Sequence, residues 1–129
     1  MKILIISNNP LILRTWDGKI PVRYIDGSAP EVLLAVRDLC HLGYRLLTHP
    51  LSGSIKPNET PYKSVLLAGT CCGTDTESIL LTENAIDVVQ RFGPIRRNWQ
   101  ERELKDFQLV DASLLAGAAE SAIADLKEI

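Results

Sequence analysis

Short apolar runs alternate with longer amphipathic segments along this chain, and that order restricts the folds open to it. The first run, at residues 2–6, is apolar after its opening lysine and rich in isoleucine, as expected for a strand buried on both faces. Further strands are predicted at residues 22–25, around residues 46–47 and at residues 64–68. A short helix is expected at residues 11–16, so each early strand is followed by a turn and a helical pattern.

The clearest helical signal follows the second predicted strand. Ser28 and Glu31 have the spacing of a capping box, in which each side chain accepts a hydrogen bond from the backbone amide of the other residue. Val32 and Val36 then begin an apolar stripe along one helix face, and Gly43 suits the left-handed residue that ends a helix. The sequence therefore predicts a helix between residues 28 and 43.

Helical patterns also cover residues 74–92 and residues 101–126. Strands that alternate with helices favour a parallel sheet with helices on its faces, because the crossovers between parallel strands are nearly always right-handed. We therefore expect a single α/β domain over residues 1–129, with three layers and a small, mainly parallel four-stranded sheet of the Rossmann-like or flavodoxin-like kind. The third and fourth strands are joined by a loop without a clear helix, so an antiparallel pair at a sheet edge is the alternative.

The overall composition excludes several classes of protein. A net charge of −2 argues against a dedicated nucleic-acid binder, which normally carries an excess of basic residues. The longest apolar stretches have about five to seven residues, whereas a membrane-spanning helix needs roughly 20, so no membrane association is expected. Three cysteines, two of them adjacent, fit neither a disulfide framework nor a zinc site. The reducing cytoplasm is the expected location, and no metal or other cofactor is predicted.

In a parallel sheet the segments that leave the strands meet at one edge, where open α/β sheets bind their ligands. Here those segments are residues 7–9, 26–28, 48–49 and 69–70. They contribute the candidate ligand-binding residues Asn8, Asn9, Asp26 and Ser28. The fold alone says nothing of the chemistry of the ligand.

The segment between residues 48 and 63 is the richest in polar groups. Its serine–glycine–serine turn offers hydroxyls and backbone amides to an anion, and Lys56 or Lys63 would add positive charge. It lacks the spacing of a P-loop, and a proline-stiffened loop whose hydroxyls bind its own backbone is the alternative. The candidate ligand-binding residues of this segment are His49, Ser52, Gly53, Ser54, Lys56 and Asn58.

His49 is the histidine best placed for acid–base chemistry, because a neutral imidazole titrates near physiological pH. With Ser52 or Ser54 as a nucleophile and Asp26 as the orienting acid, it would complete a catalytic triad. The alternative is a loop histidine that binds a backbone group. The sequence favours a binding role over catalysis.

Three segments of the first half resemble the GrdX family. They are residues 7–10, residues 24–28 and the stretch at residues 48–64, which reads THPLSGSIKPNETPYKS. Proteins of that family are small and are linked to the glycine, sarcosine and betaine reductase systems of anaerobic bacteria. The resemblance implies an accessory protein of amino-acid metabolism and carries no established reaction with it. The chain has no selenocysteine position and no CxxC motif with which to act as a reductase subunit.

From the residues and the resemblance together we expect an accessory or regulatory protein of the glycine reductase system. It would bind a small anion or a partner protein, such as a glycine reductase component, through residues 48–63. The alternative is a small enzyme that acts on a phosphorylated or carboxylated metabolite, with His49 as the acid–base group. The alanine-rich stretch at residues 112–124 suits either the core or the seam of a homodimer.

Overall fold

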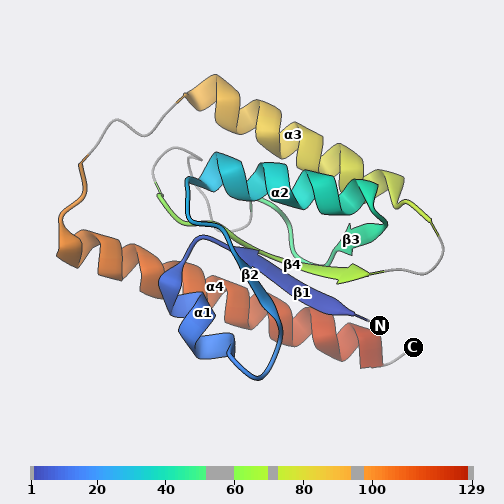
Figure 1. Cartoon of the computed structure of the whole chain (residues 1–129), viewed down its shortest axis with the longest axis horizontal. Helices are drawn as coiled ribbons and strands as arrows, with labels where there is room; N and C mark the ends of the chain where they lie inside the picture. Colours follow the sequence, from blue (N-terminus) through green and yellow to red (C-terminus); the bar gives the residue numbers. More distant parts are fainter. Residues whose placement is uncertain (1, 52–59, 70–72, 94–97, 128–129) are drawn as a thin grey trace.

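The computed structural model describes residues 2–51, 60–69, 73–93 and 98–127, and it arranges them as helices on both faces of one sheet (Figure 1). The elements, in chain order, are β1 (Ile3–Ser7), α1 (Pro10–Trp16), β2 (Val22–Tyr24), α2 (Ala29–His41), β3 (Tyr44–Leu46), β4 (Ser64–Gly69), α3 (Thr76–Phe92) and α4 (Glu101–Lys127). The strands and helices predicted from the sequence are thus confirmed within a few residues at their ends.

The sheet is mixed and not mainly parallel. Within the described part of the chain its four strands have the order β2-β1-β4-β3. β1 and β2 are parallel, whereas β4 runs antiparallel to both of its neighbours, β1 and β3. The prediction of a mainly parallel sheet is therefore wrong. An antiparallel pair needs only a loop between its strands, whereas a parallel pair needs a crossover, and β4 pairs directly with β3. Of the two strands, β3 forms the sheet edge and β4 lies inside.

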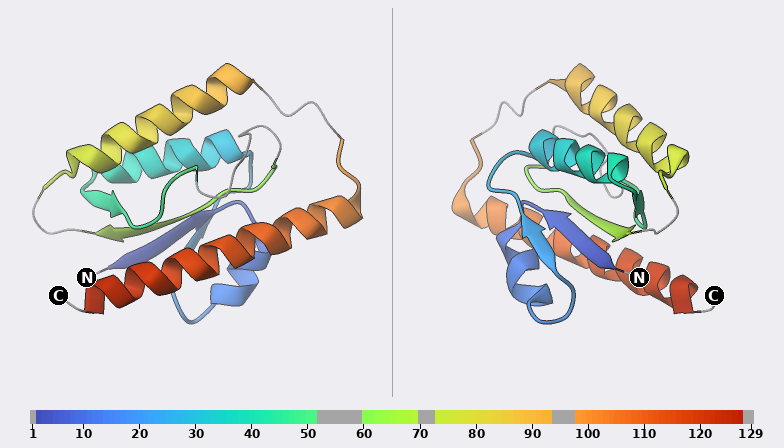
Figure 2. Two further views of the ribbon diagram at one scale, coloured as in Figure 1. Left: turned by 180° about the vertical axis from the view of Figure 1, so that it is seen from behind. Right: turned by 45° about the vertical axis from the view of Figure 1, so that its right-hand side comes forward.

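Helices cover both faces of the sheet. α2 lies on one face with α3 beside it, while α1 and α4 lie on the other (Figures 1 and 2). Alternate residues of β1 divide between these layers: Ile6 packs against Val36 of α2, and Ile5 packs in the cluster that contains Ile12 and Leu115. Burying one such aliphatic side chain contributes about 1.5–3 kcal/mol, so the two apolar faces hold the three layers together.

The start of α2 keeps only part of the predicted capping box. Ser28 is the N-cap residue, with an extended backbone, but its side chain makes no capping hydrogen bond. The Glu31 side chain does turn back over the start of the helix, because a Cβ added to Gly27 would lie 1.7 Å from its Oε2. The helix ends at His41, and Gly43 then takes a φ of +107°, the left-handed region that favours glycine.

The alanine-rich part of α4 packs against the sheet. Ala119 is fully buried and Leu115 nearly so, in the cluster with β1, β4 and α1, whereas Ala116 faces outward. The small side chain of Ala119 lets the helix lie close to the strands, which is the core alternative of the two offered by the sequence. No helix of the described residues has the length and apolar character that crossing a membrane requires.

Candidate functional site

The carboxyl ends of β1, β2 and β3 meet at one edge of the sheet, because these three strands run in the same direction. The fourth segment at this edge differs from the prediction. Since β4 is antiparallel, its end at Gly69 pairs with Tyr44 at the start of β3, on the opposite edge. The residues that lead into β4, from Thr60 to Ser64, take its place beside the ends of the other strands.

Asn8 joins three of the segments at this edge. Its Nδ2 donates to the carbonyls of Gly27 and Pro61 at 3.0 and 2.9 Å, and its Oδ1 accepts from the Lys63 amide at 2.8 Å. The side chain is 95% buried, because only 5% of the residue is exposed. Both of its N–H groups are used within the protein, so Asn8 holds the connections in place.

Asn9 and two serines connect the same edge to α4. Ser64 Oγ donates to Asp111 Oδ2 at 2.6 Å, which uses its single proton, so Ser7 Oγ donates in the 2.7 Å contact between the two hydroxyls. Ser7 Oγ in turn accepts from the Asn9 amide at 2.9 Å. Asn9 Nδ2 donates to Asp111 Oδ2 and to the Gln108 carbonyl, each at 3.0 Å. Hydrogen bonds to a carboxylate are about twice as strong as neutral ones, so this chain of donors fixes α4 against the strand ends.

Lys63 is the unusual member of this edge, since lysine is rarely so buried. Only 5% of the residue is exposed, and its backbone amide is held by Asn8. Burial lowers the pKa of the Lys63 ammonium, and the nearby Asp111 carboxylate acts in the opposite direction. A cation is thus enclosed at the end of the 48–63 segment. The carboxyl-edge cluster, as we call this group, consists of Ser7, Asn8, Asn9, Lys63, Ser64 and Asp111.

Two phenols lie at the more exposed rim of the cluster. Tyr62 OH accepts a hydrogen bond from Gln108 Nε2 at 2.8 Å, which adds a second contact between α4 and the end of the loop. At Tyr24, partial burial raises the pKa of the phenol, and the charges of Asp26 and Tyr62 raise it further. Tyr24 therefore stays protonated and able to donate at physiological pH.

Comparison with known proteins gives the chain its family. The model of the GrdX-like protein family matches residues 4–120 of the 129. The chain belongs to the GrdX family. No curated protein matches it, and no solved structure does, so the Rossmann-like or flavodoxin-like assignment is not established.

The structure of this GrdX-family chain separates the candidate residues into three groups. Asn8 and Asn9 are buried members of the carboxyl-edge cluster, whereas Asp26, Ser28 and His49 are exposed. His49 Nδ1 accepts from the Leu51 amide at 3.0 Å, so in the neutral ring the proton is on Nε2. The remaining candidates lie outside the described residues, as do the adjacent cysteines; they are Ser52, Gly53, Ser54, Lys56 and Asn58.

Sequence reasoning missed two members of the cluster. Asp111 lies 47 residues beyond Ser64, in the middle of a helix whose polar positions look alike in sequence. Ser64 was read only as the start of a strand. Lys63 was considered as an additional charge, and its burial could not be foreseen. Among the described residues no three histidine, cysteine or acidic side chains gather in a way that could hold a metal ion.

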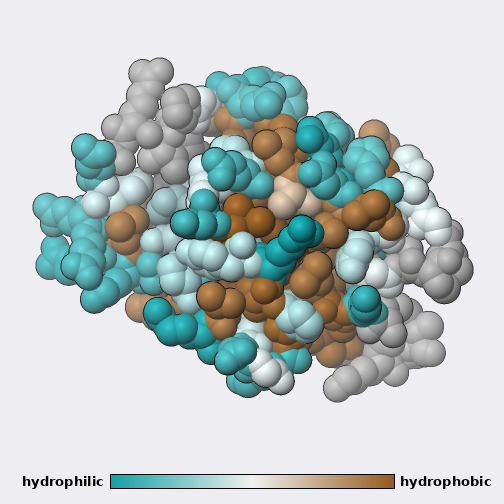
Figure 3. All heavy atoms as spheres, in the orientation of Figure 1, coloured by the Kyte–Doolittle hydropathy of each residue, from teal (hydrophilic) through white to brown (hydrophobic). Residues whose placement is uncertain are grey.

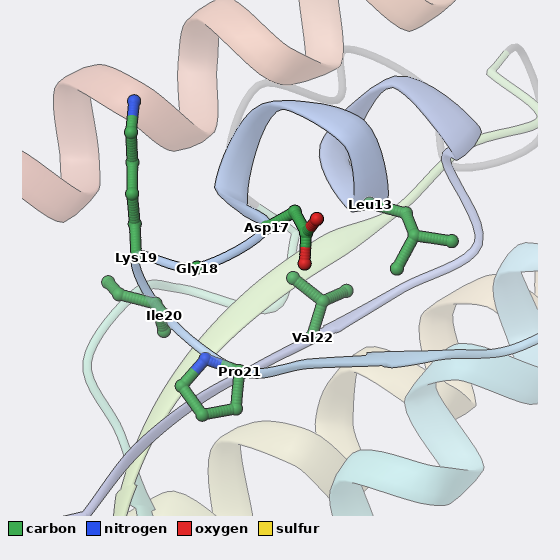
Figure 4. A pocket seen from close by; sticks show the side chains of 7 residues that line it. All are labelled: Leu13, Asp17, Gly18, Lys19, Ile20, Pro21 and Val22. Carbon is green, nitrogen blue, oxygen red and sulfur yellow. The ribbon is translucent and has the colours of Figure 1, made fainter.

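A pocket of about 350 Å³ lies away from the carboxyl-edge cluster, at the amino end of β2 (Figure 4). It is open to solvent and lies between α1 and the segment that enters the strand. In Figure 4 the Asp17 carboxylate points toward Val22, while the Lys19 side chain extends away from both. The lining residues are Leu13, Asp17, Gly18, Lys19, Ile20, Pro21 and Val22.

Proposed function

We propose that this GrdX-family protein is a cytoplasmic accessory protein of a glycine-reductase-type system, folded as a single domain. In this proposal it has no catalytic activity of its own. It binds an anionic group, carried by a small metabolite or by a component of the reductase system, where the 48–63 segment meets the carboxyl-edge cluster. Family membership supports the association with such systems.

The burial of Lys63 is the observation that carries the proposal. Removing an ammonium from water is unfavourable unless hydrogen bonds and opposite charge offset the cost, so a buried lysine at a strand edge usually has a task. Its surroundings are ordered by hydrogen bonds through Asn8, Ser64 and Asp111. An anion bound beside Lys63 would restore the stability of its charged form, and binding would then take up a proton at alkaline pH.

The exposed position of His49 favours binding over catalysis. A general base works best when its environment holds it against a substrate, and here the ring meets solvent with Nδ1 engaged by its own loop. A binding role needs only the charges of Lys63 and of the 48–63 segment. The hydroxyls and Lys56 of that segment complete the anion site in this proposal.

Calorimetric titration tests the proposal, with phosphate, acetyl phosphate, glycine and purified glycine reductase components as probes. We expect at least one of them to bind, and Lys63→Met to weaken that binding by about tenfold or more, because a charge-assisted hydrogen bond contributes roughly 1.5–3 kcal/mol. Lys105→Met is the matched control, since Lys105 is exposed on α4 in a pair with Glu101. It should bind as the parent does.

Lys56→Ala is expected to weaken binding by about tenfold while leaving stability close to that of the parent. If none of the probes binds, or if Lys63→Met and Lys105→Met bind equally well, the anion site does not exist. If the reductase components alone bind and the small anions do not, the anionic group is on the partner protein. Turnover of a probe that is lost in His49→Ala would establish the enzyme alternative instead.

A further inference from the structure

β2 is a terminal strand of the sheet, and one side of it faces away from β1. The Pro21 carbonyl and the Ile25 amide, at the two ends of the pair, both bond to β1, over N···O distances of 3.0 and 2.8 Å. Peptide groups alternate in direction along a strand, so the odd-numbered residues of this stretch face β1 and Val22 and Tyr24 face outward. In the described part of the chain these two outward peptide groups meet no other strand.

The side chains along β2 alternate as well. Val22 is paired with Ile5 and lies on the face covered by α1, as does Tyr24, whereas Arg23 is paired with Ile6 on the α2 face. Arg23 is exposed, and so is part of the Tyr24 ring. The strand therefore presents an apolar side chain, a positive charge and an aromatic ring in succession next to its free edge.

Apolar surface continues from the strand onto α1. Leu13 is 42% exposed and lines the 350 Å³ pocket together with Pro21 and Val22 (Figure 4). Figure 3 views the face that carries β2, and apolar side chains gather there around the strand. A pocket of this size beside a free strand edge has room for a side chain of an added strand.

We propose that β2 is a docking edge for an extended segment of a partner protein, which adds to the sheet as a further strand. Such strand addition derives its affinity from backbone hydrogen bonds and its specificity from alternate side chains. The segment that fits has an apolar residue opposite Val22, an acidic residue opposite Arg23 and an apolar or aromatic residue opposite Tyr24. The apolar residue at the first position enters the pocket beside Leu13.

A second copy of this chain fits the edge less well than an acidic segment does. Two β2 strands related by a two-fold axis would run antiparallel, and the register that uses all four outward N–H and C=O groups pairs Val22 with Tyr24. That register puts Arg23 opposite its own counterpart in the other copy. Like charges directly opposite each other destabilise a strand pair, so the charge of this edge selects an acidic partner.

A display library of random octapeptides, selected on the whole protein, tests the proposal. Selection should enrich peptides with alternating apolar, acidic and apolar residues, and a synthetic peptide of that pattern is then titrated by fluorescence polarisation. In Arg23→Glu the preferred central residue should change from acidic to basic, with a reversal of about tenfold or more in relative affinity. Lys63→Met should leave peptide binding unchanged, because the carboxyl-edge cluster is a separate site.

Two variants of one residue isolate the backbone contribution. Tyr24→Pro removes an N–H that faces away from β1, a position where an edge strand tolerates proline, and Tyr24→Ala removes the same ring but keeps the N–H. The peptide should bind at least about tenfold more weakly to Tyr24→Pro than to Tyr24→Ala. If Tyr24→Pro does not fold, protection of the Tyr24 amide from hydrogen exchange in the peptide complex of the parent decides the same question.

Three results would overturn the proposal. The first is a selection that enriches no sequence, and the second is a peptide that binds both Tyr24 variants equally and leaves the Tyr24 amide unprotected. The third is a dimer in sedimentation velocity that Arg23→Glu leaves intact and Tyr24→Pro dissociates. That dimer would mean that a second copy occupies the edge.

Discussion

A single hydroxyl completes the pairing of β3 with β4 where the 48–63 segment begins. Thr48 is buried, and its Oγ1 accepts a hydrogen bond from the Leu66 amide at 3.0 Å. The Leu66 carbonyl accepts from the Leu47 and Thr48 amides at 2.8 and 3.4 Å, so the N–H and C=O of Leu66 both face β3. Thr48→Val keeps the shape of the side chain but leaves the Leu66 N–H without its acceptor.

The expected cost follows from the loss of one partner of a buried hydrogen bond. A buried donor without an acceptor costs about 1–3 kcal/mol, and we expect the free energy of unfolding to fall by about 2 kcal/mol. For a chain of this length that loss lowers the Tm by roughly 6–10 °C. The change in packing adds little, because a methyl group replaces the hydroxyl.

Thr82→Val is the matched control. Thr82 is fully buried in α3, and its Oγ1 donates to the Ser78 carbonyl at 2.8 Å. That carbonyl also accepts the regular helical bond from the Thr82 amide, so the substitution strands no donor or acceptor and should cost less than about 1 kcal/mol. Urea unfolding followed by circular dichroism measures both variants. If Thr48→Val is no less stable than Thr82→Val, the hydroxyl of Thr48 is not the acceptor that the strand pair needs.

Three further predictions use the described core. Cys40 is fully buried and burial raises the pKa of its thiol, so with the adjacent cysteine pair changed to serine the folded protein should not react with a thiol reagent until urea is added. Burial lowers the pKa of Lys63 from its ordinary 10.5, so the unfolded state binds more protons and stability should rise with pH up to about 10.5; Lys63→Met should lack this part of the rise between pH 7 and 10, measured by urea unfolding. Ala119→Glu should lower the free energy of unfolding by at least about 2 kcal/mol, and Ala116→Glu, on the exposed side of α4, by less than about 0.5 kcal/mol.

The helices could be predicted because their signals are local. The spacing of Val32 and Val36, and the glycine at position 43, set the apolar face and the end of α2 without reference to any other element. The place of β4 in the sheet could not be predicted in the same way. A strand buried on both faces has an apolar run in either direction, so Val65 to Ala68 reads equally well as parallel or antiparallel. The choice depends on which neighbours its backbone meets, and that is a tertiary property.

The site was foreseen by location better than by membership. The prediction that strand exits gather beside the end of the 48–63 segment holds for Asn8, which contacts Pro61 and Lys63. Asp111 could not be found, because its role depends on α4 crossing the strand ends, and nothing in a helical pattern reports what crosses it. Burial of Lys63 depends on the same crossing, so the sequence offered the charge without its environment.

The adjacent asparagines show why a polar strand exit is ambiguous in sequence. Successive side chains point in different directions, and here Asn8 bonds to the connections before α2 and β4 while Asn9 bonds to α4. Each amide has two N–H groups, and in both residues the pair is used inside the protein. The asparagines therefore fix the positions of the segments around Lys63, and the ammonium between them is the group whose charge a ligand could satisfy. Polar residues at a strand exit can thus build a site without touching its ligand.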